Sequence, residues 1–576
     1  MPDVAETIVT ALADLGVRQI WGVVGDALNP VTDAIRREPR LEWIGVRHEE
    51  AGAFATSAQA QLTGTLAVCM GTVGPGSIHL LNGLYDAKKS HAPVLALCGQ
   101  VPLAHMGTDF FQEVDNDALF ADVAAFRHTI TSPEQMPGLL ERAVQTSIVQ
   151  RTVSVLSLPG DVGAMEMPKH AAPARFVSGP ARVVPDPAVV ADAAARIDAA
   201  ETVAMLVGIG ARDAREDVLA LADQLSAPMV LTLKAKEGLE RDNPFQVGQS
   251  GLIGNPASRR AMEGADVLLM LGTDFPYPDW YPAGKVVIQV DDRGAHIGRR
   301  TAVDLGVVGD AGLTVAALLE RVAAKPDRSH LEDSTEHFRA WRDRQLELTD
   351  PDYDHKGIVA RVRAKLDNPE ARIRPEAVAA AIDAHAAQDA IFTTDTGMST
   401  VWLSRFVEFT GTRRLVGSYN LGSMANAMPQ ALGAQALDRD RQVIAFCGDG
   451  GLTMLLGDLI TAVSHQLPIV VVVFNNGRLG MVKLEQEQGG MPEFGTQLAN
   501  PDLAAVATAI GLHGVRVEDP STLDTAIRDG LMHPGPVLLD VVTNPDEISL
   551  PPKTTASDAW GFAIAKLTEE LDSRGT

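Results

Sequence analysis

Apolar runs of strand length alternate with stretches of helical spacing from the start of the chain. The spacing predicts helices over residues 4–15 and 49–62. Short apolar runs around them predict strands over residues 19–24, 41–46, 66–70 and 93–98. Strands that alternate with helices in this way are typical of a doubly wound parallel sheet with helices on both faces.

The same alternation returns twice more along the chain. Further strands are predicted over residues 203–207, 228–233, 267–271 and 286–290, and then over residues 443–447 and 468–474. A proline-rich stretch near residues 174–187 and a charged helical stretch near residues 331–348 separate these groups. We therefore expect an α/β fold with three doubly wound parallel-sheet domains and a short C-terminal tail. Their expected bounds are residues 1–175, 185–325, 355–547 and 548–576.

The charge balance limits the partners that this protein can have. The chain has 576 residues, of which 74 are acidic and 49 basic, with a formal net charge of −25. Such a chain is not expected to bind nucleic acid or to adsorb to an anionic membrane. Its three cysteines lie in apolar runs, which favours buried thiols over disulfides or a metal site. The chain shows neither a signal peptide nor an apolar run of membrane-spanning length, so we expect a cytoplasmic protein.

The unit formed by residues 443–474 carries the strongest chemical signal. Asp449 follows its first strand and Asn476 its second, and parallel strands bring these two carboxyl ends together. Carboxylate and amide oxygens suit Mg²⁺ that holds a diphosphate. The glycines around Asp449 let the backbone approach that anion; they are Gly448, Gly450 and Gly451. One helix is expected over residues 452–463. The alternative interpretation is an Asp-Gly turn and a loop that begins with two asparagines.

This unit resembles the signature of the thiamine diphosphate enzymes. The resemblance implies that the side chains of Asp449 and Asn476 and the main-chain oxygen of Arg478 bind the metal. Two further residues of the third domain match this family. Gly397 belongs to a segment that meets the cofactor's pyrimidine, and Met424 matches the bulky residue that holds the cofactor bent. A methionine in such a place is more often part of a core.

The first domain matches the same family in its catalytic glutamate. The resemblance implies that Glu49 hydrogen-bonds N1′ of the pyrimidine and so promotes loss of the C2 proton. Without the resemblance, Glu49 would be interpreted as a charge at a helix start. The loop containing Gly74 and Gly76 resembles the one that lies against the aminopyrimidine. Phe111 and Gln112 resemble residues that meet the flavin and the reacting centre, although aromatic residues are more often core.

Four segments of the middle domain resemble the FAD-binding segments of pyruvate oxidases and pyruvate:quinone oxidoreductases. Their residues are Gly251, Leu252, Ile253 and Gly254, then Asp274, Phe275, Pro276 and Tyr277, and finally Asp291 and Asp310. The glycines permit close approach to a diphosphate, and Asp291 and Asp310 follow strands, where they can accept hydrogen bonds from ribose or adenine. Ordinary strand-end loops would explain each segment singly. Pro278 departs from the pattern, because a basic residue is expected there.

The resemblance implies an enzyme with thiamine diphosphate, Mg²⁺ and FAD that decarboxylates pyruvate oxidatively and passes the electrons to a quinone or another acceptor. Phosphate-using relatives tend to carry Gly-Ser where this chain has Asp26-Ala27, so we expect acetate as the product. The alternatives are an acetolactate-synthase-like carboligase with a structural FAD, a phosphate-dependent pyruvate oxidase and a catalytically silent assembly protein.

The resemblance also bears on assembly. In this family the domains that carry Glu49 and Asp449 meet across a subunit boundary, which implies a homodimer or homotetramer. The quinone-linked relatives end in a lipid-binding segment, and the tail of this chain has one apolar helical face. Its residues are Trp560, Ile564, Leu567 and Leu571. Because the tail is short and its opposite face is acidic, we expect it to dock on the protein, with at most weak peripheral membrane contact.

Overall fold

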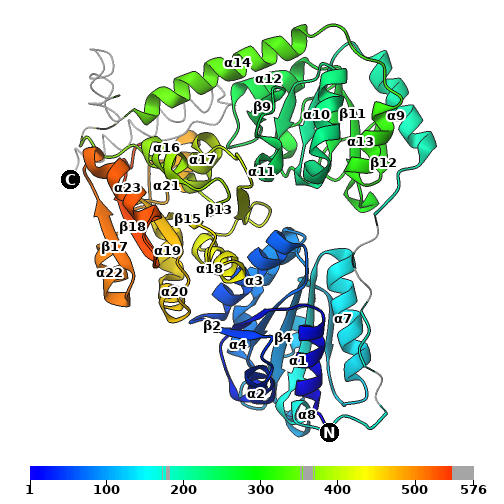
Figure 1. Ribbon diagram of the computed structural model, residues 1–576, viewed down its shortest axis with the longest axis vertical. Helices are drawn as coiled ribbons and strands as arrows, with labels where there is room; N and C mark the ends of the chain where they lie inside the picture. The colour runs from blue at the N-terminus through cyan, green and yellow to red at the C-terminus, as the bar shows by residue number, and fades with distance from the viewer. Residues whose placement is uncertain are drawn as a thin grey trace.

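The chain folds into three parallel six-stranded sheets that follow one another along the sequence (Figure 1). This computed structural model describes residues 1–170, 173–176, 179, 182–350, 353, 368 and 370–547. The predicted α/β class and the three parallel sheets are confirmed. The predicted tail and its apolar face lie outside the described residues, as does part of the proline-rich stretch.

The first sheet has the strand order β2-β1-β3-β4-β6-β5. Its strands are β1 (Gln19–Gly22), β2 (Glu42–Gly45), β3 (Ala67–Gly71), β4 (Val94–Gln100), β5 (Ala124–Thr129) and β6 (Val153–Pro159). The helices around it include α1 (Val4–Asp14), α2 (Asn29–Arg37), α3 (Glu49–Thr63), α4 (Pro75–His79), α5 (Leu81–Lys89) and α7 (Met136–Gln150). Every residue of β4 and β6 is buried, because helices cover both faces of these central strands.

The second sheet has the order β12-β11-β10-β7-β8-β9. Its strands are β7 (Val203–Val207), β8 (Met229–Leu231), β9 (Gln246–Gln249), β10 (Val267–Leu271), β11 (Val286–Asp291) and β12 (Leu305–Val308). Its helices include α9 (Pro187–Ala199), α10 (Arg215–Gln224), α12 (Pro256–Gly264) and α13 (Ala311–Leu319). The long helix α14 (Ser329–Leu346) corresponds to the predicted charged stretch and leads toward the third sheet (Figure 1).

The third sheet has the order β14-β13-β15-β16-β18-β17. Its strands are β13 (Ile391–Thr394), β14 (Arg414–Gly417), β15 (Val443–Gly448), β16 (Val470–Asn475), β17 (His513–Val517) and β18 (Val537–Val542). Its helices include α16 (Pro375–His385), α17 (Met398–Phe406), α18 (Ala427–Leu437), α21 (Gly480–Gln488), α22 (Leu503–Ile510) and α23 (Leu523–Leu531). Gly448 at the end of β15 lies opposite Phe474 near the end of β16, so the predicted pairing of these carboxyl ends is confirmed.

The single helix expected over residues 452–463 is wrong. The chain forms α19 (Asp449–Met454), a 3₁₀ turn η9 (Leu456–Asp458) and α20 (Leu459–Ser464), with Leu455 outside the helical region at φ −124° and ψ 30°. The break places Asp458 against the first domain, where its side chain accepts hydrogen bonds from the backbone N–H groups of Arg47 at 2.7 Å and His48 at 3.2 Å. This contact between domains has no counterpart in the local apolar pattern.

The first and third domains share one hydrophobic core. Helix α3 packs against α18, near the centre of Figure 1. Phe54 and Ala55 of α3 belong to the same buried cluster as Leu432 of α18. The helices approach so closely at Gly433 that an added Cβ would lie 2.2 Å from the carbonyl oxygen of Ala55. The side chain of Gln59 bridges the helices by donating to the carbonyl oxygen of Gly433 at 3.1 Å.

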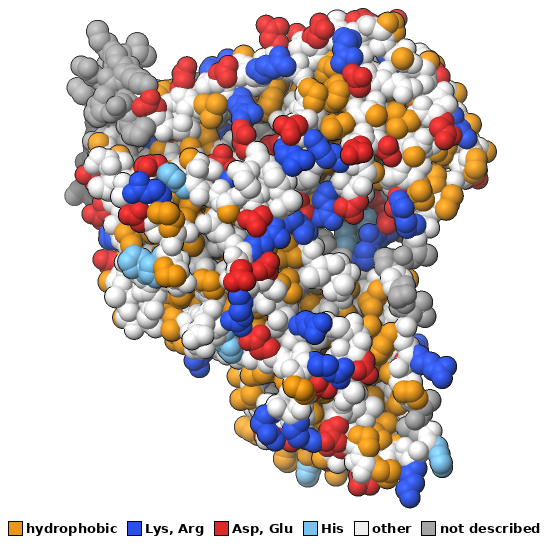
Figure 2. Space-filling model, viewed as in Figure 1, with side chains coloured by type: hydrophobic (Ala, Val, Ile, Leu, Met, Phe, Trp, Pro, Cys, Tyr) orange, Lys and Arg blue, Asp and Glu red, His pale blue; other side chains and the backbone are white. Residues whose placement is uncertain are grey.

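The surface carries charges of both signs. On the face drawn in Figure 2, acidic and basic side chains are interspersed. Among the described residues, no helix is both long and apolar enough to cross a bilayer.

We predict that Gly433→Ala destabilises the contact between α3 and α18. The new methyl group meets backbone, which no side-chain rotation can relieve, and overpacking of this kind costs about 1–3 kcal/mol. Thermal unfolding should show a lower midpoint than that of the wild type. Gly457→Ala is the matched control, because a Cβ at Gly457 has no atom within 4 Å. Equal midpoints for the two variants would contradict the prediction.

Candidate active site

Asp449 and the loop after β16 form one hydrogen-bonded unit. Asp449 begins α19 and is 2 % exposed. Its Oδ2 accepts from the backbone N–H of Gly477 at 2.8 Å and from Asn500 Nδ2 at 2.6 Å. Asn476 Oδ1 accepts from the backbone N–H of Arg478 at 3.0 Å. Burial raises the pKa of Asp449, whereas a bound cation would favour its charged form.

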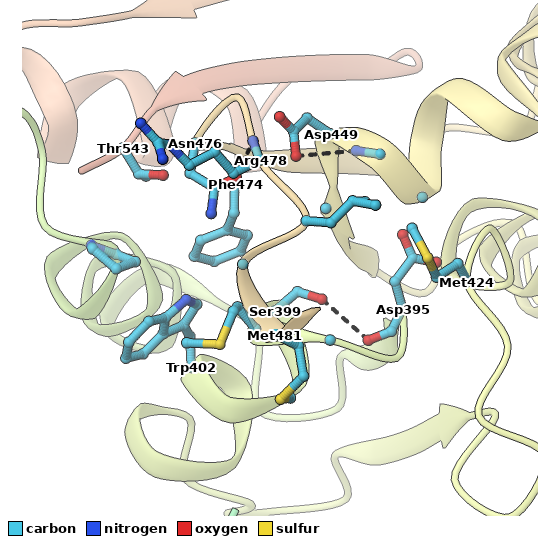
Figure 3. A pocket seen from close by; sticks show the side chains of 18 of the residues that line it. Asp395, Ser399, Trp402, Met424, Asp449, Phe474, Asn476, Arg478, Met481 and Thr543 are labelled. Carbon is cyan, nitrogen blue, oxygen red and sulfur yellow. Dashed lines mark hydrogen bonds between the residues drawn. The ribbon is translucent and has the colours of Figure 1, made fainter. Parts of the chain in front are cut away.

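These residues line a cavity at the carboxyl edge of the third sheet (Figure 3). The structure brings together here every third-domain residue that the sequence predicted for the site. They are Gly397, Met424, Gly448, Asp449, Gly450, Gly451, Asn476 and Arg478. Met424 lies beside the glycine loop, since its Cε would be 3.3 Å from a Cβ at Gly450. Trp402 and Met481 contribute apolar surface to the same cavity (Figure 3).

The structure adds Asn500, which the sequence analysis did not single out. Its side-chain amide donates both to Asp449 and to Asn475 Oδ1, the latter at 3.0 Å, and so connects the start of α19 to the end of β16. The side chain of Arg478 forms an ion pair with Glu493, which lies between α21 and α22, as Asn500 does. A position before Pro501 marks Asn500 as part of a loop, but no local signal identifies its partners.

Asp395 is the second carboxylate in this cavity and was also not predicted as a site residue. It is 1 % exposed, and its Oδ1 accepts from the backbone N–H of Ala427 at 2.9 Å. Its Oδ2 has no hydrogen-bond partner within the described part of the chain and faces Gly451, where a Cβ would lie 2.3 Å away. Burial raises its pKa from the usual 3.8 to about 7.

The first domain holds Glu49 at the start of α3, with 7 % of its surface exposed. Its Oε2 lies 2.9 Å from Nδ1 of His79. Its Oε1 faces the glycine loop, because a Cβ at Gly76 would be 2.9 Å from this oxygen. The buried hydroxyl of Thr72 in this loop has no hydrogen-bond partner among the described residues. Ligand atoms of His48, Glu49 and His79 lie within 4.8 Å of one another, but His48 Nδ1 already accepts from the backbone N–H of Glu50.

Gln112 lies against the same loop, and Phe111 directly precedes it. Gly74 has a φ of +64°, and a Cβ there would be 2.8 Å from the carbonyl oxygen of Gln112. Gln112 itself has a φ of +66°, an uncommon backbone conformation for a non-glycine residue. Phe111 is 79 % exposed, so within one chain it is not a core residue.

The predicted residues thus form two separate groups within one chain. Among the described residues, none from the first domain lines the third-domain cavity. That cavity encloses about 90 Å³, whereas sites for cofactor-sized molecules usually measure roughly 300–1,000 Å³. The donor sets nevertheless fit thiamine diphosphate and Mg²⁺. The third-domain group offers oxygen ligands and a glycine-lined approach for a diphosphate, and the first-domain group offers a buried carboxyl and an unpartnered hydroxyl.

The four predicted flavin segments meet at the carboxyl edge of the second sheet. The backbone N–H of Gly309 donates to the carbonyl oxygen of Asp291 at 3.0 Å. Gly251, with a φ of +89°, approaches the rings of Phe275 and Tyr277 so closely that a Cβ would lie 3.1 and 3.0 Å from them. Conformational freedom at Gly251 is therefore required by packing within the chain as well as by any ligand.

The remaining residues of these segments differ in their surroundings. The backbone N–H of Gly254 donates to the carbonyl oxygen of Gly251 at 3.0 Å, and Ile253 packs against the core of the third domain. Leu252 is 37 % exposed. Pro276 lies in the loop between Phe275 and Tyr277.

Asp274 connects all three domains. Its Oδ2 lies 3.3 Å from His91 Nε2 of the first domain and accepts from Asn420 Nδ2 of the third domain at 3.2 Å. Its Oδ1 pairs with Arg300 at 2.9 Å. The role of Asp274 within one chain is therefore to hold the domains together.

The two aspartates at strand ends, Asp291 and Asp310, differ in their surroundings. Asp310 Oδ1 caps α13 by accepting from the backbone N–H of Leu313 at 2.9 Å, and it also pairs with Arg182 at 2.8 Å. Burial raises the pKa of Asp291 to about 6.

Loop N–H groups and nearby arginines suit the phosphates of a dinucleotide. The cavity beside Arg300 encloses only about 10 Å³, room for about one water molecule, so a flavin would lie along the open edge.

Comparison with known proteins assigns each part of the chain. Residues 2–119 match the N-terminal TPP-binding domain of thiamine pyrophosphate enzymes, residues 190–318 match the central domain, and residues 395–541 match the C-terminal TPP-binding domain.

Full-length relatives agree with these matches. The chain is 37 % identical over 560 residues to YdaP of Bacillus subtilis, which its name describes provisionally as a thiamine pyrophosphate-containing protein; the match covers 96 % of this chain and 93 % of YdaP. It is 30 % identical over 548 residues to a pyruvate oxidase of Lactiplantibacillus plantarum, with 94 % and 88 % covered. It is also 30 % identical over 562 residues to an acetolactate synthase large subunit of Parasynechococcus marenigrum, with 93 % and 87 % covered.

We predict that Asp395→Asn changes how stability depends on pH. Between pH 3.8 and about 7 the folded protein keeps a proton on Asp395 that the unfolded chain releases, so this group lowers stability as pH rises through that window. The variant cannot ionise there, and it should gain up to about 1.4 kcal/mol per pH unit relative to the wild type. Urea unfolding midpoints of the cofactor-free protein across this window measure the difference.

The exposed Asp217→Asn is the control for loss of one carboxylate. It should follow the wild-type pH profile. A profile of Asp395→Asn parallel to that of the wild type would contradict the assigned burial effect.

Proposed function

The chain belongs to the thiamine pyrophosphate enzyme family, and on that premise we propose that it oxidises and decarboxylates pyruvate to acetate and CO₂. The proposed cofactors are thiamine diphosphate, Mg²⁺ and FAD, and the electrons pass from FAD to a quinone or another acceptor. When bound, thiamine diphosphate supplies the carbanion chemistry, and FAD supplies the acceptor for two electrons.

The observation that carries the proposal is the placement of Glu49 against the glycine loop. One carboxylate oxygen faces Gly76, where the aminopyrimidine is expected to lie, and burial keeps water away from it. Glu49 can therefore hold or release a proton at the pyrimidine nitrogen. Asp449 and Asn476 provide the oxygen ligands for Mg²⁺ on the diphosphate.

An oxidase is favoured over a carboligase by the surroundings of Glu49. Phe111 is exposed and directly precedes Gln112, whose carbonyl oxygen faces Gly74 of the glycine loop, so its aromatic ring is available to contact a flavin. The acetolactate-synthase-like carboligase stays the second candidate, because relatives with both names are equally similar to this chain. A silent assembly protein would have no use for Glu49, Asp449 and Asn476 in combination.

The product is proposed to be acetate because of Asp26. A Cβ at Gly25 would lie 2.2 Å from Thr72 Oγ1, so the turn that carries Asp26 packs directly on the glycine loop. The exposed carboxylate of Asp26 repels phosphate from this region, and Ala27 has no hydroxyl to bind it.

A homodimer is the smallest assembly that we propose. The first-domain group and the third-domain cavity are separate within one chain, and among the described residues none of the first domain lines that cavity. A second copy that brings its first domain to this cavity would complete the site. A homotetramer would contain two such dimers.

The test of function is an anaerobic flavin spectrum of the purified protein with thiamine diphosphate and Mg²⁺. Pyruvate should bleach the oxidised flavin. Glu49→Gln should slow the bleaching at least about 100-fold, because a proton-transfer group is lost. Glu50→Gln is the matched control, since its amide oxygen can still accept from Asn82. Pyruvate consumption with flavin that stays oxidised would favour the carboligase, and a protein without flavin would overturn the proposal of FAD.

A separate prediction concerns phosphate. Added phosphate should neither speed turnover nor yield acetyl phosphate, because Asp26 carries a negative charge where phosphate users place glycine. The double variant Asp26→Gly/Ala27→Ser removes the charge and adds a hydroxyl, and it should become sensitive to phosphate. Product analysis by NMR distinguishes acetate from acetyl phosphate. Acetyl phosphate from the wild type would contradict the assignment.

A further inference from the structure

The two oxygens of the Glu49 carboxylate have different surroundings. Oε1 faces the glycine loop at Gly76, and Oε2 lies 2.9 Å from Nδ1 of His79. When the proton that Glu49 shares with the cofactor is on Oε1 or has left it, Oε2 can only accept, so the proton between Oε2 and His79 belongs to Nδ1. This contact fixes the carboxylate rotamer that aims Oε1 at the loop.

His79 is itself held in place. It is the last residue of α4, and its ring stacks on His48 with centroids 4.3 Å apart and planes 25° apart. His48 is the N-cap of α3, and its Nδ1 accepts from the backbone N–H of Glu50 at 3.2 Å. The stack therefore fixes the ring of His79 relative to the first turn of α3, and Glu49 is the first residue of that turn.

The neighbouring glutamate has a different partner. Glu50 Oε1 accepts from Asn82 Nδ2 at 2.7 Å, and the same amide reaches Ser423 Oγ of the third domain at 3.1 Å. Glu50 is thus committed to the contact between domains. Of the two adjacent carboxylates, Glu49 alone is paired with a histidine within the described part of the chain.

We propose that His79 is a positioning residue for Glu49: its Nδ1–H holds Oε2, so that Oε1 carries the proton that Glu49 shares with the pyrimidine nitrogen of the cofactor. The assignment rests on the proposed role of Glu49 in thiamine diphosphate activation. His79 acts through Glu49 and does not itself reach the reacting atoms. Loss of its N–H releases the carboxylate to other rotamers, which lowers the fraction of enzyme in which the proton can move.

Two substitutions separate the N–H donor from the ring. His79→Phe keeps a ring that can stack on His48 but has no donor. His79→Asn loses the ring, yet its Nδ2 can occupy the place of Nδ1 and donate to Glu49. His128→Gln removes an exposed histidine of β5 and is the control for loss of an imidazole elsewhere.

The first measurement is hydrogen–deuterium exchange at C2 of enzyme-bound thiamine diphosphate, without pyruvate or an electron acceptor. His79→Phe should slow this exchange about tenfold to a hundredfold, the usual effect of removing a partner that orients a site residue. His79→Asn should recover most of the wild-type rate, and His128→Gln should match it. Binding of thiamine diphosphate, measured by titration, should change much less than the exchange rate in every variant.

The second measurement needs no cofactor. NMR of the protein labelled with ¹⁵N-histidine should show the proton of neutral His79 on Nδ1, and Glu49→Leu should move it to Nε2. An Nε2 proton in the wild type, or wild-type exchange in His79→Phe, would overturn the assignment of His79 alone. Equal losses of cofactor binding and of exchange in both His79 variants would also overturn it in favour of a structural role. A wild-type protein that binds no thiamine diphosphate would overturn the proposed function and this assignment together.

Discussion

Parallel strands in one sheet all end at the same edge, and the chemistry of this chain depends on that constraint. In the third sheet it brings Asp449 after β15 next to Asn476 after β16. In the first sheet it brings the turn after β1 onto the loop after β3, where Gly25 contacts Thr72. Residues that are far apart in sequence thus become neighbours because their strands are neighbours in the sheet. No contact between their own side chains is needed.

The sequence predicted much of this fold because buried parallel strands are short apolar runs. The predicted bounds of β7 and β10 match the structure, and β11 extends by one residue. The strand β5 was not predicted, since four of its six residues are exposed or half-buried and it has no apolar run. The strands β6, β9 and β12 were not predicted either, because serine, glutamine or glycine interrupts the apolar residues of each.

The site residues also divide into those that the sequence predicted and those that it did not. Asp449 and Asn476 follow strands directly, so their positions could be predicted from the local pattern, whereas Glu49 at the start of α3 was singled out through the family resemblance. Asn500 and His79 reach the site through tertiary contacts across 51 and 30 residues of chain, and no local pattern carries such information. The break in the helix after Met454 has the same origin, because Asp458 is held by the backbone of the first domain.

The bond between Asp458 and the backbone before Glu49 limits how this chain can be recombined. The Asp458 carboxylate, which holds the backbone just before α3, lies nine residues after Asp449 and in a different domain from Glu49. The first domain is therefore not an exchangeable module. A chimaera that takes its first domain from a relative must take residues 427–464 from the same parent, because α18 packs on α3 and Asp458 binds the backbone just before it. A substitution on one side of this contact requires a compensating substitution on the other side.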